Sequence, residues 1–232
     1  MAMTGIAALV FDLDGTLVEF RIDYDAVRRE ALEALSQIEG LPEDIRSSRT
    51  GIFGILDKVS QYLEGKANSE TITEDLRTKF SKIADRYELS AARTTEMIPG
   101  ARDSLEEIRS QGYKMGLFTT SGREAMNHIL QRFHLERYFE ACVSREDAPK
   151  VKPHPLHLNR VLEILGVTPN EALVVGDSSY DAVCAKAAGV RSVGVLSGVH
   201  KLSQLQSAGA DYVINRLGEL PQLIHRINDE KP

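Results

Sequence analysis

Cysteine is scarce in this sequence: Cys142 and Cys184 are the only two among 232 residues. Each stands in an apolar stretch, EACVS or DAVCAKAAG. Two such cysteines do not make the disulfide framework of a small secreted domain, and we expect two buried free thiols in a reducing compartment. The sequence therefore predicts a cytoplasmic protein.

Long hydrophobic runs and blocks of like charge are also missing. The first apolar run covers only residues 6–11 and ends in acidic residues, so it resembles neither a signal peptide nor a membrane span. The 28 basic and 34 acidic residues give a net charge of −6, without a run of five or six like charges. We therefore expect neither a nucleic acid nor a membrane as a partner.

What the sequence does contain is a series of short apolar segments, each about as long as a β-strand. Four of them lack polar alternation, which is typical of strands buried on both faces. The segments lie at 6–11, 114–120, 139–144, 172–177, 191–196 and 211–214. Amphipathic helical patterns lie between or after them, at 101–112, 123–133, 155–166, 181–189 and 217–227. This alternation predicts an α/β fold with a doubly wound, Rossmann-like parallel sheet.

One interval breaks the alternation, because residues 20–95 contain no convincing strand. Apolar residues recur there at helical spacing, in segments 23–38, 52–65 and 71–92. We interpret the interval as an all-helical insertion that leaves the core after the first strand and returns at Pro99-Gly100. The expected division is a core domain of residues 1–19 and 96–232 with a helical domain of residues 20–95.

Polar side chains stand where the apolar runs end, which is where ligands bind in an open parallel sheet. The candidates after the first, second and fourth runs are Asp12 and Asp14, Thr119 and Thr120, and Asp177, with Asp181 four residues further on. Lys152, in VKPHP, is expected in a loop that precedes a helix. The same edge of the sheet would therefore carry several carboxylates, two hydroxyls and one ammonium.

Asp12 and Asp14 are spaced so that both lie on one side of an extended chain, and Gly15 permits a sharp turn. A third carboxylate at Asp177 would make the mutual repulsion too costly without a cation. Oxygen ligands without histidine or cysteine suit Mg²⁺, which is usually shared with a phosphate. Thr119 at a helix start and Lys152 would form an anion site. A carboxylate beside Mg²⁺ is then placed to attack phosphorus and form an aspartyl-phosphate.

These motifs carry a family resemblance. DLDGT at 12–16, a hydrophobic strand ending at Thr119, Lys152-Pro153 and GDSSYD at 176–181 follow one another in this order. The chain resembles, over nearly its whole length, the phosphatases of the haloacid dehalogenase superfamily that carry a helical, C1-type cap after the first motif. Relatives that cleave carbon–halogen or phosphonate bonds lack or replace the second aspartate, whereas Asp14 is present here, so the resemblance favours hydrolysis of phosphate esters.

The resemblance also implies roles for the matching residues. Asp12 would be the nucleophile, and Asp14 would protonate the leaving alcohol and then activate water. Thr119 would bind the phosphoryl oxygens, with Thr120 beside it, and Lys152 would neutralise charge on nucleophile and phosphate. Mg²⁺ would be held by Asp12, the backbone carbonyl of Asp14 and Asp177, with Asp181 as an outer support of the metal site. Thr120 stands where many relatives have asparagine, and Val151 where many have glycine.

Substrate choice is expected to reside in the helical insertion, which would close over the site and exclude water. The candidate segment is IRSSRTGIFG, where Arg46 or Arg49 would offer a cation; two solvated arginines are the alternative. The expected partner is a small phosphorylated metabolite, with a phosphoglycolate-like acid favoured and sugar phosphates and nucleoside monophosphates open. Two other functions also stay open, a phosphoglucomutase-like phosphotransferase and a non-catalytic phosphate-binding or interaction protein. Both a monomer and a homodimer are acceptable.

Overall fold

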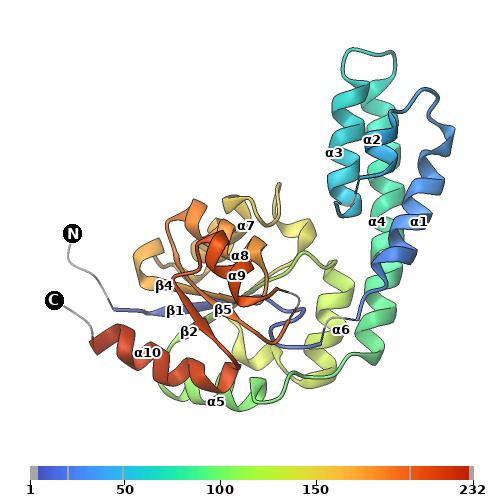
Figure 1. Cartoon of the computed structure of the whole chain (residues 1–232). Coiled ribbons are helices and arrows are strands. Elements are labelled where there is room, and N and C mark those ends of the chain that lie inside the picture. Colours follow the sequence, from blue (N-terminus) through green and yellow to red (C-terminus); the bar gives the residue numbers. More distant parts are fainter. Residues whose placement is uncertain (1–4, 20, 49, 199, 230–232) are drawn as a thin grey trace. The chain divides into compact units, whose positions relative to one another are not determined.

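The computed structural model describes residues 5–19, 21–48, 50–198 and 200–229. The chain divides into two compact units, Met1–Arg21 with Ala92–Pro232, and Ile22–Ala91. The first unit contains a sheet with helices on it, and the second consists of helices (Figure 1). None of the described helices is both long enough and apolar enough to cross a membrane.

The sheet of the first unit is built from parallel strands in the order β3-β2-β1-β4-β5-β6. The strands are β1 (Ala8–Phe11), β2 (Lys114–Phe118), β3 (Ala141–Val143), β4 (Ala172–Gly176), β5 (Arg191–Val195) and β6 (Tyr212–Ile214). Every apolar segment that was predicted to be a strand forms one. The strand order reverses beside β1, which pairs with both β2 and β4, and a ligand crevice is expected outside the carboxyl ends at such a point.

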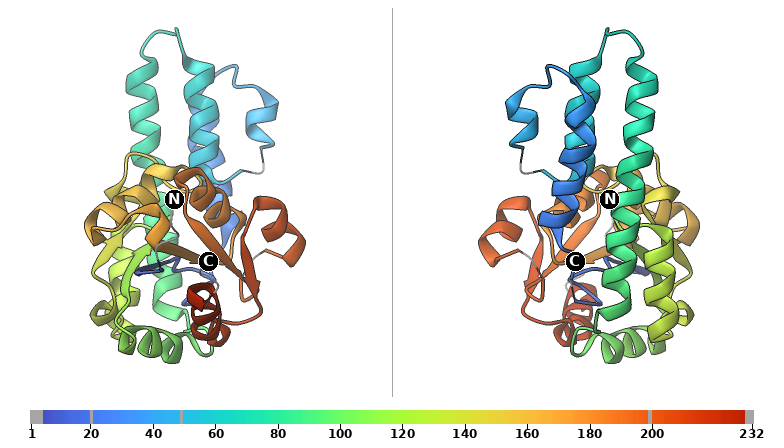
Figure 2. Two further views of the ribbon diagram at one scale, coloured as in Figure 1. Left: turned by 90° about the vertical axis from the view of Figure 1, so that its left-hand side faces the viewer. Right: turned by 90° about the vertical axis from the view of Figure 1, so that its right-hand side faces the viewer.

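Helices cover both faces of this sheet. Successive residues of a strand point to opposite faces, so one strand contributes side chains to two cores. Leu9 and Phe11 of β1 pack in one core with α5 (Ala101–Ser110), α6 (Arg123–Phe133) and α10 (Leu220–Asp229). Ala8 and Val10 of the same strand pack in a second core with α7 (Pro155–Leu165) and α8 (Ser179–Ala188). Figure 2 shows the sheet between these helices. The predicted doubly wound α/β fold is confirmed.

Local sequence signals set the ends of the helices that flank the chemistry. Helix α7 begins after His154, whose Nδ1 accepts a hydrogen bond from the backbone N–H of Leu156, and Pro155 occupies its first position. Helix α8 begins at a capping box in which the Ser178 hydroxyl and the Asp181 carboxylate bind each other's backbone N–H groups. These caps place the first turns of both helices at the carboxyl edge of the sheet.

The second unit has a hydrophobic core of its own. Its helices are α1 (Tyr24–Ala34), the short α2 (Glu43–Arg46), α3 (Ile52–Leu63) and α4 (Ser69–Thr94), of which α4 continues past the boundary of the unit. Ile55 and Val59 of α3 and Phe80 of α4 are fully buried in that core. Tyr87 donates a hydrogen bond of 2.6 Å to Glu30, which ties α4 to α1. The helices predicted for this interval are present, whereas α2 and, in the first unit, α9 (Leu202–Ala208) were not predicted.

Candidate active site

The ends of three neighbouring strands bring the candidate residues together. Asp12 directly follows β1, Thr119 follows β2 and Asp177 follows β4. The backbone N–H of Asp12 donates to Val175 of β4 at 2.9 Å, so the sheet register continues to the point where the carboxylates begin. Residues far apart in the sequence therefore meet at one edge, as expected for a parallel sheet.

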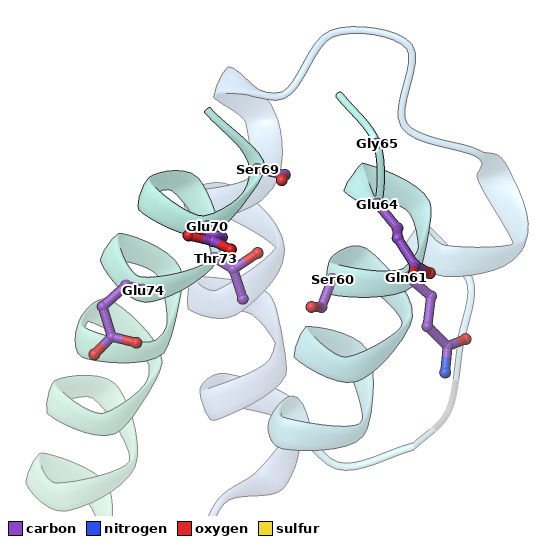
Figure 3. A pocket seen from close by; sticks show the side chains of 8 residues that line it. All are labelled: Ser60, Gln61, Glu64, Gly65, Ser69, Glu70, Thr73 and Glu74. Atoms are coloured by element: carbon purple, nitrogen blue, oxygen red, sulfur yellow. The ribbon is translucent and has the colours of Figure 1, made fainter. Parts of the chain in front are cut away.

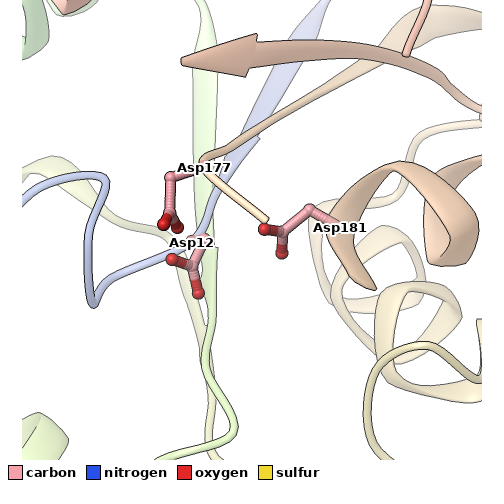
Figure 4. Close-up of side chains that lie close together, drawn as sticks. All are labelled: Asp12, Asp177 and Asp181. Atoms are coloured by element: carbon pink, nitrogen blue, oxygen red, sulfur yellow. The ribbon is translucent and has the colours of Figure 1, made fainter. Parts of the chain in front are cut away.

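Three buried carboxylates form a cluster at this edge. One oxygen from each of Asp12, Asp177 and Asp181 lies within 4.8 Å of the others, and Figure 4 shows these side chains converging from β1, β4 and the first turn of α8. Burial raises the pKa of the Asp12 carboxyl well above its usual value; Lys152 opposes this rise, and the neighbouring carboxylates add to it. The cluster thus concentrates negative charge where water cannot screen it.

Lys152 is the cation that the protein supplies to this cluster. Its Nζ lies 2.5 Å from Asp12 Oδ1 and 2.7 Å from Asp181 Oδ1, and only 7% of the residue is exposed. The same ammonium donates to the backbone carbonyl of Phe118 at 3.3 Å. Burial alone would lower the pKa of Lys152, but the two carboxylates raise it above its usual value. Lys152 is therefore a charged group fixed between two site carboxylates.

Asp14 has different partners from Asp12, although only one residue separates them. Asp14 Oδ2 accepts hydrogen bonds from Ser121 Oγ at 2.8 Å and from Thr119 Oγ1 at 3.2 Å. Asp14 is half-buried, whereas Asp12 is 6% exposed. The two carboxylates thus occupy distinct environments, which suits two distinct chemical roles.

Two glycines let the backbone approach Asp177 closely. Gly15 has a φ of +91°, and a Cβ built on it would lie 2.5 Å from Asp177 Oδ2. A Cβ on Gly198 would lie 1.8 Å from the same oxygen. Neither position can carry a side chain without moving Asp177, since such separations are far below van der Waals contact. The loop after β5 therefore belongs to the site as well.

Thr120 and the two arginines were also predicted as site residues. Thr120 is exposed, and its backbone carbonyl accepts a hydrogen bond of 2.9 Å from Arg145. Arg46 is half-buried in the helical unit, where it donates to the carbonyl of Ile38. Arg49, which the sequence suggested as a substrate-binding residue, lies outside the described residues.

Sequence reasoning gave too little weight to two hydroxyl residues. Thr16 is fully buried, and its Oγ1 lies 3.2 Å from Asp12 Oδ2 and 3.4 Å from Asp177 Oδ1. Ser121 binds Asp14 directly, as described above. The sequence signal for both residues was only their position: Thr16 follows Asp14, and Ser121 follows Thr119, by a few residues.

The cluster has the composition of a site for a hard divalent cation. Three carboxylates share one ammonium, so two more positive charges are needed to balance them when all are ionised. Asp181 already accepts from Lys152 through Oδ1 and from Ser178 through Oδ2. Asp12 likewise accepts from Lys152 through Oδ1 and from Thr16 through Oδ2, and Asp177 accepts from Thr16 through Oδ1. All three residues therefore offer carboxylate oxygens to such a cation.

A hollow of about 600 Å³ lies in the helical unit, between α3 and α4 (Figure 3). Its lining is polar and carries three glutamates, which would repel a phosphorylated compound. The lining residues are Ser60, Gln61, Glu64, Gly65, Ser69, Glu70, Thr73 and Glu74. These lining residues include no lysine, arginine or histidine that would balance the charge of a phosphate.

Known proteins resemble this chain over almost its full length. The family described as haloacid dehalogenase-like hydrolase matches residues 9–195. A phosphoglycolate phosphatase from Vibrio parahaemolyticus is 29% identical, and the match covers 97% of this chain and 98% of that one. The pyrophosphatase PpaX from Bacillus cereus is 26% identical, with 96% and 98% covered. The fold matches that of a crystallised hydrolase from Pseudomonas syringae, with a TM-score of 0.65, 24% identity and coverage of 95% of this chain and 99% of that one.

Proposed function

Because the chain belongs to the haloacid dehalogenase-like hydrolases and is a phosphatase of that family, we propose that it hydrolyses a small phosphomonoester through an aspartyl-phosphate on Asp12, with Mg²⁺ as its metal. One observation carries the proposal. Asp12 is held from both sides, by Lys152 at Oδ1 and by Thr16 at Oδ2, inside the carboxylate cluster. A carboxylate fixed in this way is oriented for attack on phosphorus.

The first chemical step forms the bond between the Asp12 carboxylate and phosphorus, while the bond from phosphorus to the leaving oxygen breaks. Lys152 neutralises charge on the attacking carboxylate and on the phosphoryl oxygens. Thr119 would turn its hydroxyl from Asp14, which accepts from it in the structure, to donate to one of those oxygens.

Proton transfer is the task of Asp14. Its carboxylic acid donates a proton to the leaving alcohol oxygen in the first step. The resulting carboxylate then takes a proton from the water that attacks phosphorus, which releases orthophosphate and restores the Asp12 carboxylate. Ser121 holds Asp14 in place for both transfers.

The metal would be held by Asp12, Asp177 and the backbone carbonyl of Asp14. When bound, Mg²⁺ supplies positive charge to the attacking carboxylate and the phosphoryl oxygens. Asp181 supports the site from outside, because it holds Lys152 and is itself fixed by Ser178. Gly15 and Gly198 leave the space that Asp177 occupies.

The names of two relatives support a substrate class. A phosphoglycolate phosphatase and a pyrophosphatase both resemble this chain at similar identity, and the compounds in their names carry a second anionic group close to the phosphate. We favour a phosphoglycolate-like acid on this basis. The helical unit would act as the cap that selects it, with the segment that contains Arg46 as the recognition element.

Phosphate release from a panel of compounds tests this function. The panel contains 2-phosphoglycolate, pyrophosphate, hexose phosphates and nucleoside monophosphates, each with Mg²⁺ or with EDTA, for the wild type and Asp12→Asn. We expect Mg²⁺-dependent release that is fastest with phosphoglycolate and absent in the variant. Isomerisation of a hexose phosphate without phosphate release would favour the phosphotransferase instead, and no reaction with any compound would favour a non-catalytic protein.

A further inference from the structure

His157 is a buried histidine that the chemistry above does not use. It is the third residue of α7 and is fully buried, with its ring tilted at 52° against Phe118 and the two ring centroids 5.5 Å apart. The ring lies among apolar side chains of the second core, whose members include Leu158 and Val161. A polar ring in such a place costs free energy unless its nitrogens are hydrogen-bonded.

Only one of its nitrogens makes a hydrogen bond among the described residues. Nδ1 accepts from the backbone N–H of Lys152 at 3.3 Å, whereas buried Nε2 has no hydrogen-bond partner. Because Nδ1 accepts, the proton of the neutral ring is on Nε2. Burial lowers the pKa of His157 to about 4, and the positive charge of Lys152 acts in the same direction. The ring is therefore neutral at physiological pH and offers one lone pair, aimed at Lys152.

Lys152 connects this hydrogen bond to the active site. Its ammonium lies 4.1 Å from the centroid of the Phe118 ring and donates hydrogen bonds to the Phe118 carbonyl and to the Asp12 carboxylate. Phe118 thus packs against both His157 and the Lys152 side chain. The backbone of Lys152 is fixed at one end by His157, and its charge is fixed at the other end by carboxylates.

We propose that His157 is a positioning residue, whose Nδ1 holds the Lys152 backbone so that the ammonium lies where the nucleophile and the phosphate need it. The inference rests on the proposed function in one respect, the role of Lys152 toward phosphate. An apolar residue at this position would leave the backbone N–H of Lys152 without its hydrogen-bond acceptor. The acceptor at Nδ1 is what an apolar residue could not supply.

Two substitutions separate positioning from packing. His157→Leu fills a similar volume but removes the hydrogen-bond acceptor. His157→Asn offers a side-chain oxygen that can replace Nδ1 as the acceptor, but it loses much of the volume. We expect Leu to lower kcat by about tenfold or more with a smaller change in KM, since misplacement of a catalytic group is costly. We expect Asn to retain most of kcat while melting at a lower temperature than Leu. His225→Leu, at an exposed histidine on α10, is the control for unrelated loss of histidine.

A higher kcat together with a lower melting temperature in His157→Asn than in His157→Leu would support a positioning role for His157. If kcat followed melting temperature in both variants, His157 would be a packing residue and the inference would be wrong. Equal kcat in Leu and wild type would also overturn it.

Binding of inorganic orthophosphate, measured by calorimetry in the presence of Mg²⁺, gives a readout besides turnover. We expect His157→Leu to weaken phosphate binding when it is introduced into the wild type. Introduced into Lys152→Met, it should cause no further loss, because both residues act through the Lys152 ammonium. Additive losses would overturn the inference while leaving the role of Lys152 intact. Unchanged phosphate binding in Lys152→Met would refute the proposed role of the lysine and the inference with it.

Discussion

Lys152 and Asp181 form a buried ion pair, in which Nζ lies 2.7 Å from Oδ1 and each side chain is 3% exposed. The ammonium reaches Asp12 from the same position. Lys152 is therefore both a structural counter-ion for two carboxylates and a proposed contact for phosphate. This double role makes its replacement informative about stability and about activity.

Lys152→Met should destabilise the protein and abolish turnover. Removing one partner of a buried ion pair leaves uncompensated charge, which typically costs about 3–5 kcal/mol of unfolding free energy. Urea denaturation without Mg²⁺ measures the loss. Lys150→Met, at an exposed lysine of the same loop, should leave both properties unchanged. A Lys152→Met protein as stable as the wild type would show that the pair is not formed.

Asp14→Asn should separate the two halves of the reaction. With 4-nitrophenyl phosphate, whose leaving group needs no protonation, the first step should stay fast, while hydrolysis of the phosphoenzyme slows by roughly 10²–10⁴-fold. Rapid mixing should then show a burst of nitrophenolate close to one equivalent of enzyme, followed by slow turnover. If burst and steady state both kept the wild-type rate, Asp14 would not be the acid and base.

Gly198→Ala should weaken metal binding. The added Cβ would lie 1.8 Å from Asp177 Oδ2, so this carboxylate must move away from its place in the cluster. The Mg²⁺ concentration needed for half-maximal activity should rise by about tenfold or more, since changes to the groups that position metal ligands have effects of this size. Gly218→Ala, where a Cβ has open space, is the matched control. An unchanged Mg²⁺ requirement in Gly198→Ala would contradict the assignment of Asp177 as a metal ligand.

His157 should make the protein less stable in acid. Its pKa is about 4 in the folded state and about 6.5 when unfolded, so the unfolded chain binds more protons between these values. Unfolding free energy should therefore fall as pH drops from about 6.5 to 4, by on the order of 3 kcal/mol from this residue. The difference between wild type and His157→Leu in denaturation curves at several pH values isolates this contribution. A difference that does not vary with pH would show that His157 titrates normally.

The elements that repeat a strong local pattern were predictable from the sequence. Each strand corresponds to an apolar run in the sequence. The polar residues at the ends of these runs were predicted to lie together, because the carboxyl ends of parallel strands lie at one edge of the sheet. Helices α2 and α9 were missed since four or seven residues are too short to show a helical period. The sequence contains no signal for how such short segments pack.

Contacts across the fold were less predictable than the strand ends. Nothing local indicates that Ser121 binds Asp14, because this contact depends on how two loops meet after the sheet has formed. The hydroxyl of Thr16 lies within hydrogen-bonding distance of two carboxylates, Asp12 and Asp177. Tertiary packing decides these partners, and a single sequence shows only that the polar groups are available.

The role of Asp12 as the nucleophile can be tested with phosphoglycolate that is labelled in its phosphoryl group. The reaction is quenched with acid during turnover, and the labelled peptide is then mapped. We expect one phosphoryl group on the peptide that contains Asp12, and none in the Asp12→Asn variant. Phosphate release without any phosphorylated peptide, or with the label on another residue, would contradict Asp12 as the nucleophile.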